Sequence, residues 1–404
     1  MRPLPLSWSL VTRSRRAGVE FPCGTKMNPR LLVVVVVVVA ALGLSVPCAI
    51  SAPREDAKHL GHANVDGGGA VVGALRLSSW NLEWLADPRE LDAAGFWQTC
   101  EARNWPNEKP GPGLPMCDVY RRDRIFSAAD YEALKLGPLR AALADMAARG
   151  LDLLAVQEVR GPAALQAVLP QGFRVACFTT REDAQNIGFA VREAAGLQPR
   201  CREIRALSLE DEPRVGHRVR RGLELVLRVN GGNIALLNVH LKSGCPGGRL
   251  DNPRNAACPV LQQQASPLEQ WIEGQANAGN AFLIVGDWNR DLEQEVRRRF
   301  PARSDGSDPA GPIDPATVRN LFPEIDDGKP PASAMAVVAV DRRAAARHGC
   351  HATLDQLVVS QSLLGLLDPG SLAGGKPAAV LTRPPGKATD HCSLDTVLPF
   401  RAQP

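Results

Sequence analysis

Short apolar runs of strand length recur along this chain and alternate with runs that have a helical pattern. The expected strands are rich in Val, Leu and Ile and are mostly bounded by Gly, Asp or Asn. They span residues 72–80, 152–157, 173–178, 186–192, 222–229, 233–240, 281–286, 354–360 and 378–382. The spacing of apolar residues predicts helices over 130–149, 161–169, 259–278 and 291–299. This alternation predicts a single α/β domain of roughly 330 residues.

The first 52 residues have the pattern of a secretion signal. Arg30 precedes an apolar run from Leu31 to Val46, and small residues follow it at Ala49–Ala52. The run is shorter than the ~20 residues that a membrane span needs. We expect residues 1–52 to be a signal peptide, with translation starting at Met27 and no stable membrane span in the mature chain. An uncleaved membrane anchor is the alternative.

The rest of the chain divides by composition. Residues 53–70 are polar and rich in glycine, which predicts a flexible linker. Residues 71–404 hold the predicted strands and helices. Within them, residues 87–128 and 301–345 have loop-like compositions, so we expect two long surface insertions.

Eight cysteines follow the leader, and an even number suits an exported protein whose cysteines pair. Zinc binding by cysteines is the alternative, but the chain has no Cys-x-x-Cys pair. The simplest pairing joins neighbours in the sequence: Cys100–Cys117, Cys177–Cys201, Cys245–Cys258 and Cys350–Cys392. We therefore expect the protein to be secreted or periplasmic.

The net charge of +4 comes from the leader. Without the six basic residues and one acidic residue of positions 1–52, the totals of 47 basic and 43 acidic residues become 41 and 42, a net charge of −1. A general binder of polyanions has a basic excess. Affinity for nucleic acid must therefore come from a local patch or a bound cation.

Polar or acidic residues stand at the ends of predicted strands in five places. A sheet that collects such ends on one rim brings their oxygen atoms together, and Mg²⁺ prefers oxygen ligands. The five places are Ser79–Glu83, Val156–Val159, Asn238–Gly244, Val285–Arg290, and Leu354–Gln356 together with Thr389–Cys392.

The same segments hold groups for proton transfer. Hydrolysis of a phosphodiester needs a cation to stabilise charge on the phosphoryl oxygens, a base for the attacking water and a proton donor for the leaving oxygen. His240 and His391 suit the proton transfers. Asp355 suits the orientation of an imidazole through its second ring nitrogen.

Taken in order, these segments resemble the endonuclease/exonuclease/phosphatase superfamily from about residue 75 to residue 397. The resemblance implies an α/β (α+β) fold in which two mixed β-sheets pack as a sandwich, with helices on the outer faces and the active site at one end. It implies catalytic roles for the residues His240, Asp287, Asn289, Asp355 and His391. It implies metal binding by Asn81, Glu158 and Asp390, with Mg²⁺ as the expected ion and Mn²⁺ or Ca²⁺ as alternatives.

Candidate substrate-binding residues lie outside these motifs. Arg218, Arg220 and Arg221 precede the strand at 222 and suit contact with a phosphate backbone; a solvated entry to the strand is the alternative. Asn186 lies where many members of the superfamily place a cleft residue, and capping of the strand is the alternative.

We expect an exported, Mg²⁺-dependent phosphodiesterase that is a monomer and acts as a nuclease on DNA or RNA. A sphingomyelinase-like phospholipid phosphodiesterase or a phosphatase is the alternative. Trp97 and Trp105 are then the candidates for contact with a membrane. The third hypothesis is a catalytically silent binding module.

Overall fold

The computed structural model describes residues 73–102, 111, 113–211, 219–305, 313–342, 350–351, 353–372, 377–382 and 388–402. The chain divides into the units Met1–Asp66 and Gly67–Pro404, and all described residues belong to the second unit. The expected signal peptide and linker therefore lie outside the described residues. Within the described part of the chain, no helix is long and apolar enough to cross a membrane.

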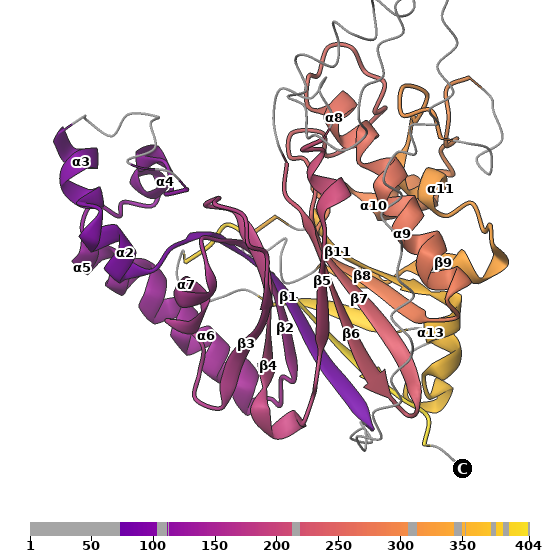
Figure 1. Ribbon diagram of the computed structural model, residues 1–404, viewed down its shortest axis with the longest axis horizontal. Helices are drawn as coiled ribbons and strands as arrows, with labels where there is room; N and C mark the ends of the chain where they lie inside the picture. The colour runs from indigo at the N-terminus through magenta and orange to yellow at the C-terminus, as the bar shows by residue number, and fades with distance from the viewer. Residues whose placement is uncertain are drawn as a thin grey trace, which may run out of the picture. The chain divides into compact units, whose positions relative to one another are not determined.

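Two β-sheets form the centre of this unit (Figure 1). The first sheet has the order β10-β12-β13-β1-β2-β4-β3, and the second has the order β5-β6-β7-β8-β11-β9. Both sheets are mixed, because β1 and β2, β10 and β12, and β7 and β8 pair in parallel while the other neighbours are antiparallel.

The first sheet is made of β1 (Ala74–Leu85), β2 (Leu153–Val159), β3 (Phe173–Phe178), β4 (Asn186–Arg192), β10 (Ala339–Asp341), β12 (Ala378–Thr382) and β13 (Ser393–Pro399). The second is made of β5 (Arg200–Ile204), β6 (Gly222–Val229), β7 (Gly232–His240), β8 (Ala281–Asp287), β9 (Met335–Val337) and β11 (Asp355–Ser360).

The α-helices are α2 (Pro88–Ala93), α3 (Phe96–Ala102), α4 (Cys117–Arg122), α5 (Ala128–Tyr131), α6 (Gly137–Ala148), α7 (Pro162–Gln166), α8 (Cys258–Gln263), α9 (Ala265–Asn277), α10 (Leu292–Arg298), α11 (Leu321–Ile325) and α13 (Gln361–Leu366). Shorter helical turns are η1 (Glu132–Leu136), η2 (Glu193–Ala195), η3 (Arg205–Ser208), η4 (Pro331–Ser333) and η5 (Pro369–Ser371).

Three apolar clusters hold these layers together. The first combines inward-facing residues of both sheets, such as Leu77 and Leu153 of one with Leu236 and Leu283 of the other. The second lies between the first sheet and α6 and α7, and the third lies between the second sheet and α8 to α11 (Figure 1). Because side chains alternate along a strand, each sheet contributes to the shared core with one face and to a helix layer with the other. The predicted sandwich with helices outside is confirmed.

The nine predicted strands are present, and β5, β9, β10 and β13 were not predicted. The predicted helix at 259–278 is two helices, α8 and α9, that meet at Gln264. The predicted helix at 130–149 is α5 and α6 with the wider turn η1 between them. The predicted helices at 161–169 and 291–299 correspond to the shorter α7 and α10.

The segment 87–128 has a core of its own where it is described. Its helices α2, α3 and α4 bury Phe96, Trp97 and Tyr120, whose rings contact one another and Tyr131. The Cys100–Cys117 disulfide joins α3 to α4. This part of the expected surface insertion is therefore a packed helical layer.

All four predicted disulfides are present: Cys100–Cys117, Cys177–Cys201, Cys245–Cys258 and Cys350–Cys392. Two of them flank segments that carry predicted catalytic residues. Cys245 follows the end of β7 by five positions, and Cys392 follows His391 directly.

Candidate active site

Strand register places three of the predicted catalytic residues side by side. In the second sheet, His240 at the end of β7 pairs with Asp287 at the end of β8, and Asp287 pairs with Asp355 at the start of β11. Because β7 and β8 are parallel and β11 runs the opposite way, all three positions fall at the same end of the sheet.

The first sheet contributes the remaining residues at its matching end. Asn81 of β1 pairs with Gln157 of β2, next to Glu158, and His391 lies two positions before β13, the other neighbour of β1. The Asn81 Nδ2 atom donates to Glu158 Oε1 at 3.2 Å and to Asp287 Oδ2 at 3.0 Å. Asn81 thus links the carboxylates of the two sheets.

A glycine permits the close approach of β7 and β8 at this end. Gly286 has a φ of 134°, in the region that side chains disfavour. A Cβ atom at this position would collide with the Val239 carbonyl oxygen and lie 3.0 Å from Asn238 Oδ1. The Gly-Asp sequence therefore sets the position of Asp287 beside His240.

Two of the predicted site residues have left-handed backbone conformations. The φ values are 57° for Glu158 and 51° for Asn289. Such conformations are uncommon outside glycine and gather at functional sites, where surrounding contacts hold them. The Asn289 backbone N–H donates to Asp287 Oδ1 at 2.8 Å, and its side-chain amide donates to the Leu241 carbonyl at 3.1 Å.

Glu158, His240, Asp287, Asn289 and His391 line a cavity of about 290 Å³. Its lining within the described residues is polar and includes groups from both sheets and from the segment 87–128. The lining residues are Glu83, Trp84, Arg122, Glu158, Gln185, Arg220, His240, Ser243, Asp287, Asn289, His351, Leu354, Asp390 and His391.

His391 is held by a carboxylate on the side away from the cavity. Its Nδ1 lies 2.6 Å from Asp355 Oδ2, and both side chains are buried. Burial lowers the pKa of His391, but Asp355, Asp287 and Asp390 outweigh it and hold that pKa well above the ordinary value. The ring is therefore charged at neutral pH, with Nε2 3.9 Å from Asp287 Oδ2.

His240 has the opposite electrostatic environment. Burial, together with the positive charges of Arg220 and His391, holds the pKa of His240 well below its ordinary value. Its Nε2 lies 3.5 Å from both Glu158 Oε1 and Asp287 Oδ2, and its Nδ1 has no hydrogen-bond partner among the described residues. The two imidazoles of the site thus differ in charge.

The carboxylates of Glu158 and Asp287 suit a hard divalent cation. Burial raises the pKa of Glu158, and burial raises the pKa of Asp287 to about 6 despite the nearby His391 charge. A buried and a partly buried carboxylate that share one amide donor are costly without a neutralising positive charge, and oxygen donors are what Mg²⁺ prefers. The donor set therefore fits the expected ion.

Two of the expected metal-binding residues have other contacts. Asn81 turns its amide nitrogen towards the carboxylates, while its Oδ1 accepts from the Glu83 backbone N–H at 2.9 Å. Asp390 lies beside His351. Metal binding by Asn81 and Asp390 stays a prediction.

Two of the expected substrate-binding residues, Asn186 and Arg221, do not belong to the described lining of this cavity. Arg221 pairs with Glu203 at 2.6 Å and with Glu210 at 3.1 Å. Asn186 is buried and donates to the Arg160, Arg181 and Asp183 carbonyls, which fits a structural cap on β4. Arg218 lies outside the described residues.

Arg220, from the same run of arginines, does line the cavity and donates to the Leu241 carbonyl at 2.7 Å. Among the other lining residues, Arg122 and His351 were missed by sequence reasoning, and Glu83 ends the segment Ser79–Glu83 but had no predicted role. Glu83 accepts from the Asp390 backbone N–H at 3.1 Å and forms an ion pair with Arg122. The predicted Cys350–Cys392 pair was a signal for His351, because it places that residue next to His391.

With this geometry established, comparison with known proteins identifies the family. The sequence model of the Endonuclease/Exonuclease/phosphatase family matches residues 79–391. The chain belongs to this family, and the prediction of a phosphoric-ester hydrolase is confirmed. No curated protein sequence matched the chain.

Solved structures with similar folds include truncated TDP2 from Caenorhabditis elegans, which is 14% identical, with 81% of this chain and 98% of that chain covered and a TM-score of 0.40. The AP endonuclease LMAP from Leishmania major is 16% identical, with 81% and 88% covered and a TM-score of 0.43. The 3′ phosphatase NExo from Neisseria, bound to a product DNA hairpin, is 14% identical, with 81% and 100% covered and a TM-score of 0.41.

Proposed function

We propose that this protein is an exported, Mg²⁺-dependent phosphodiesterase and that its substrate is a nucleic acid. The observation that supports this most strongly is the convergence of Glu158, Asp287, His240 and His391 on one cavity. These residues come from both sheets and from widely separated parts of the chain.

In this proposal, Glu158 and Asp287 hold the metal ion, and Asn81 keeps their carboxylates in place. The bound ion stabilises the negative charge that develops on the phosphoryl oxygens. Arg122 and Arg220 line the same cavity and add positive charge for the phosphate. Arg122 has an exposed side chain, so it is accessible to a polymeric substrate.

The residues also account for the proton transfers. A water molecule attacks phosphorus and gives its proton to Nε2 of neutral His240, which lies 3.5 Å from Asp287 Oδ2. The ester P–O bond breaks, and charged His391 donates a proton to the leaving oxygen from Nε2. The Asn289 N–H fixes Asp287 Oδ1 and so keeps this carboxylate in position.

Two observations bear on the substrate and the compartment. Trp97, a candidate for membrane contact, is only 8% exposed and lies in the aromatic cluster of α3 and α4, which favours nucleic acid over a lipid surface. Trp105 lies outside the described residues. The four disulfides support an oxidising compartment and hence export.

The test is the rate of hydrolysis of plasmid DNA and of RNA with Mg²⁺. We expect Glu158→Ala and His391→Ala each to lose at least roughly 100-fold in rate, the usual contribution of such groups. Asp145→Ala removes an exposed carboxylate of α6 and serves as the matched control. A nearly unchanged rate in either site variant contradicts the proposal. Release of phosphocholine from sphingomyelin vesicles without DNA cleavage favours the phospholipid alternative.

A further inference from the structure

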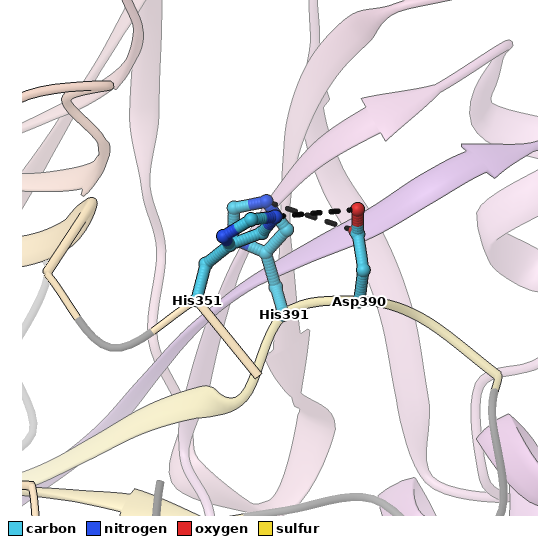
Figure 2. Close-up of side chains that lie close together, drawn as sticks. All are labelled: His351, Asp390 and His391. Atoms are coloured by element: carbon cyan, nitrogen blue, oxygen red, sulfur yellow. Dashed lines mark ion pairs between the residues drawn. The ribbon is translucent and has the colours of Figure 1, made fainter. Parts of the chain in front are cut away.

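His351, Asp390 and His391 lie together at the cavity and turn their polar atoms towards one another (Figure 2). We propose that these three side chains bind a transition-metal ion of the Zn²⁺ type, at a site distinct from the hard-ion site of Glu158 and Asp287. The proposed site rests on its own geometry and not on the hydrolytic function.

The distances fit a tetrahedral ion. His351 Nε2 lies 3.5 Å from Asp390 Oδ2, and His391 Nε2 lies 3.8 Å from Asp390 Oδ1. The ligand atoms of the three residues all lie within 4.8 Å of one another. Ligands about 2.0–2.1 Å from Zn²⁺ in a tetrahedron are separated by about 3.4 Å, so small side-chain rotations suffice.

A covalent and hydrogen-bonded scaffold fixes the two histidines side by side. The disulfide joins Cys350 to Cys392, the neighbours of the two histidines in sequence. The His351 backbone N–H also donates to the Asp390 carbonyl at 3.0 Å, and the two imidazole centroids lie 5.0 Å apart. Such a site is formed before the ion arrives, which lowers the entropic cost of binding.

Asp355 supports the proposed metal site through its contact with His391. It contacts His391 Nδ1 at 2.6 Å, so Nε2 is the nitrogen that binds the metal, which displaces its proton to solvent. A carboxylate on the far nitrogen of a metal-binding histidine fixes the ring orientation and raises its basicity.

The donor set selects the kind of ion. Two imidazole nitrogens and one carboxylate suit Zn²⁺ and related transition metals, whereas Mg²⁺ prefers oxygen ligands alone. The side chains of His351 and Asp390 are 53% and 38% exposed, so solvent reaches the site and supplies the fourth ligand. Arg122 lies 3.8 Å from Asp390 Oδ2 but is also paired with Glu83.

If the protein hydrolyses phosphodiesters as proposed, an ion bound at this site should inhibit that reaction. An ion on His391 Nε2 blocks the nitrogen that donates the proton to the leaving oxygen. Zn²⁺ should therefore inhibit hydrolysis that is supported by Mg²⁺, and the inhibition should depend on His351.

The test is calorimetric titration of the oxidised, metal-free protein with Zn²⁺ in saturating Mg²⁺, with Co²⁺ absorption as a second readout of ligand geometry. We expect one Zn²⁺ site whose affinity falls at least tenfold in both His351→Ala and His351→Gln. His62→Ala controls for the loss of a histidine elsewhere in the chain. Unchanged Zn²⁺ affinity in the two His351 variants overturns the proposal.

Activity measurements distinguish the proposed Zn²⁺ site from the proposed hydrolytic function. Each variant is compared with its own rate in Mg²⁺ alone, and Zn²⁺ should inhibit His351→Ala less than it inhibits the wild-type protein. Binding of Zn²⁺ that depends on His351, in a protein that hydrolyses no phosphodiester, refutes the proposed function and leaves the metal site standing.

Discussion

The contact between Asp355 and His391 should control both the rate and the pH dependence of catalysis. Replacing Asp355 with asparagine keeps the size and shape of the side chain but removes the negative charge 2.6 Å from His391 Nδ1. A hydrogen bond to a charged group contributes about 1.5–3 kcal/mol. At about 1.36 kcal/mol for each tenfold change in rate, the expected loss in kcat is roughly 10- to 150-fold.

The same substitution should change the pH dependence of the reaction. Burial alone lowers the pKa of His391, and Asp355 is the largest of the influences that raise it. Without that charge the imidazolium loses its proton at a lower pH. Because the proposal requires charged His391, the alkaline limb of the pH–rate profile should move to lower pH in Asp355→Asn.

The assay is hydrolysis of a labelled oligonucleotide with Mg²⁺ across a pH series. Asp395→Asn makes the same chemical change on β13. Asp395 accepts a hydrogen bond from the Ser78 hydroxyl at 2.7 Å and does not belong to the cavity lining. That control should keep the wild-type kcat and alkaline limb. An Asp355→Asn enzyme with both properties unchanged refutes the reasoning.

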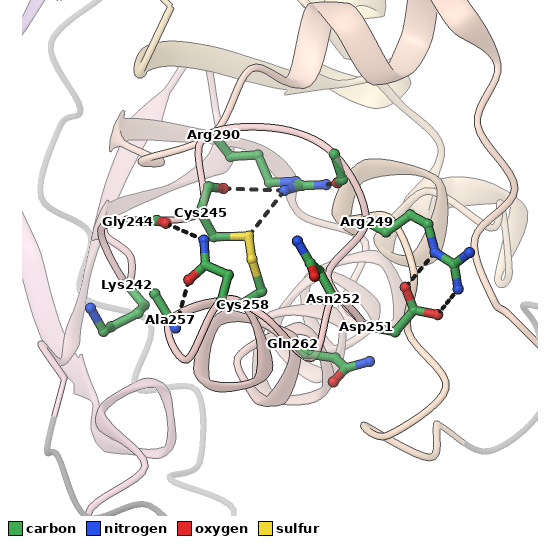
Figure 3. Close-up of a disulfide and its surroundings, with 12 residues drawn as sticks. Lys242, Gly244, Cys245, Arg249, Asp251, Asn252, Ala257, Cys258, Gln262 and Arg290 are labelled. Atoms are coloured by element: carbon green, nitrogen blue, oxygen red, sulfur yellow. Dashed lines mark hydrogen bonds and ion pairs between the residues drawn. A yellow bond between two sulfur atoms is a disulfide. The ribbon is translucent and has the colours of Figure 1, made fainter.

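Three further predictions concern the scaffold of the site, each measured by chemical denaturation. Gly286→Ala forces a Cβ against Val239 and should cost at least about 1–3 kcal/mol, whereas Gly274→Ala, with open space around it in α9, should cost nothing. Buried Arg290 pairs with Glu295 and donates to the Cys245 carbonyl beside the disulfide (Figure 3), so Arg290→Met should cost about 3–5 kcal/mol. Arg249→Met, which breaks only the exposed pair with Asp251, should change stability little; equal effects of the two substitutions would contradict this view. Replacing both Cys350 and Cys392 with serine should cost about 2–4 kcal/mol, and unchanged stability would show that this bridge adds nothing.

The central strands could be predicted because burial on both sides leaves a clear apolar pattern. The strand β8 is buried along its whole length and reads as Ala-Phe-Leu-Ile-Val before the Gly-Asp pair. The strands that were missed are short or lie at an edge, as β5, β9 and β10 do, or mix polar and apolar residues, as β13 does. Edge strands bury too little surface to impose such a pattern.

The site was predictable where a polar residue ends a buried strand, as Asp287 ends β8. Arg122 gave no such signal, because it comes from a helical layer whose position over the cavity depends on tertiary packing of Trp97 and Tyr120. For the same reason, nothing in the sequence separated Arg220, which faces the cavity, from its neighbour Arg221, which pairs with Glu203 and Glu210.

The central claim is that Glu158 and Asp287 hold a divalent ion that the hydrolysis of a phosphodiester requires. The most direct measurement is the cleavage rate of plasmid DNA and RNA by the purified, oxidised protein with Mg²⁺ and with excess chelator. The account predicts cleavage with Mg²⁺, loss of cleavage with chelator and recovery when Mg²⁺ is restored. Cleavage that persists in chelator, or none of either substrate in Mg²⁺, would contradict it.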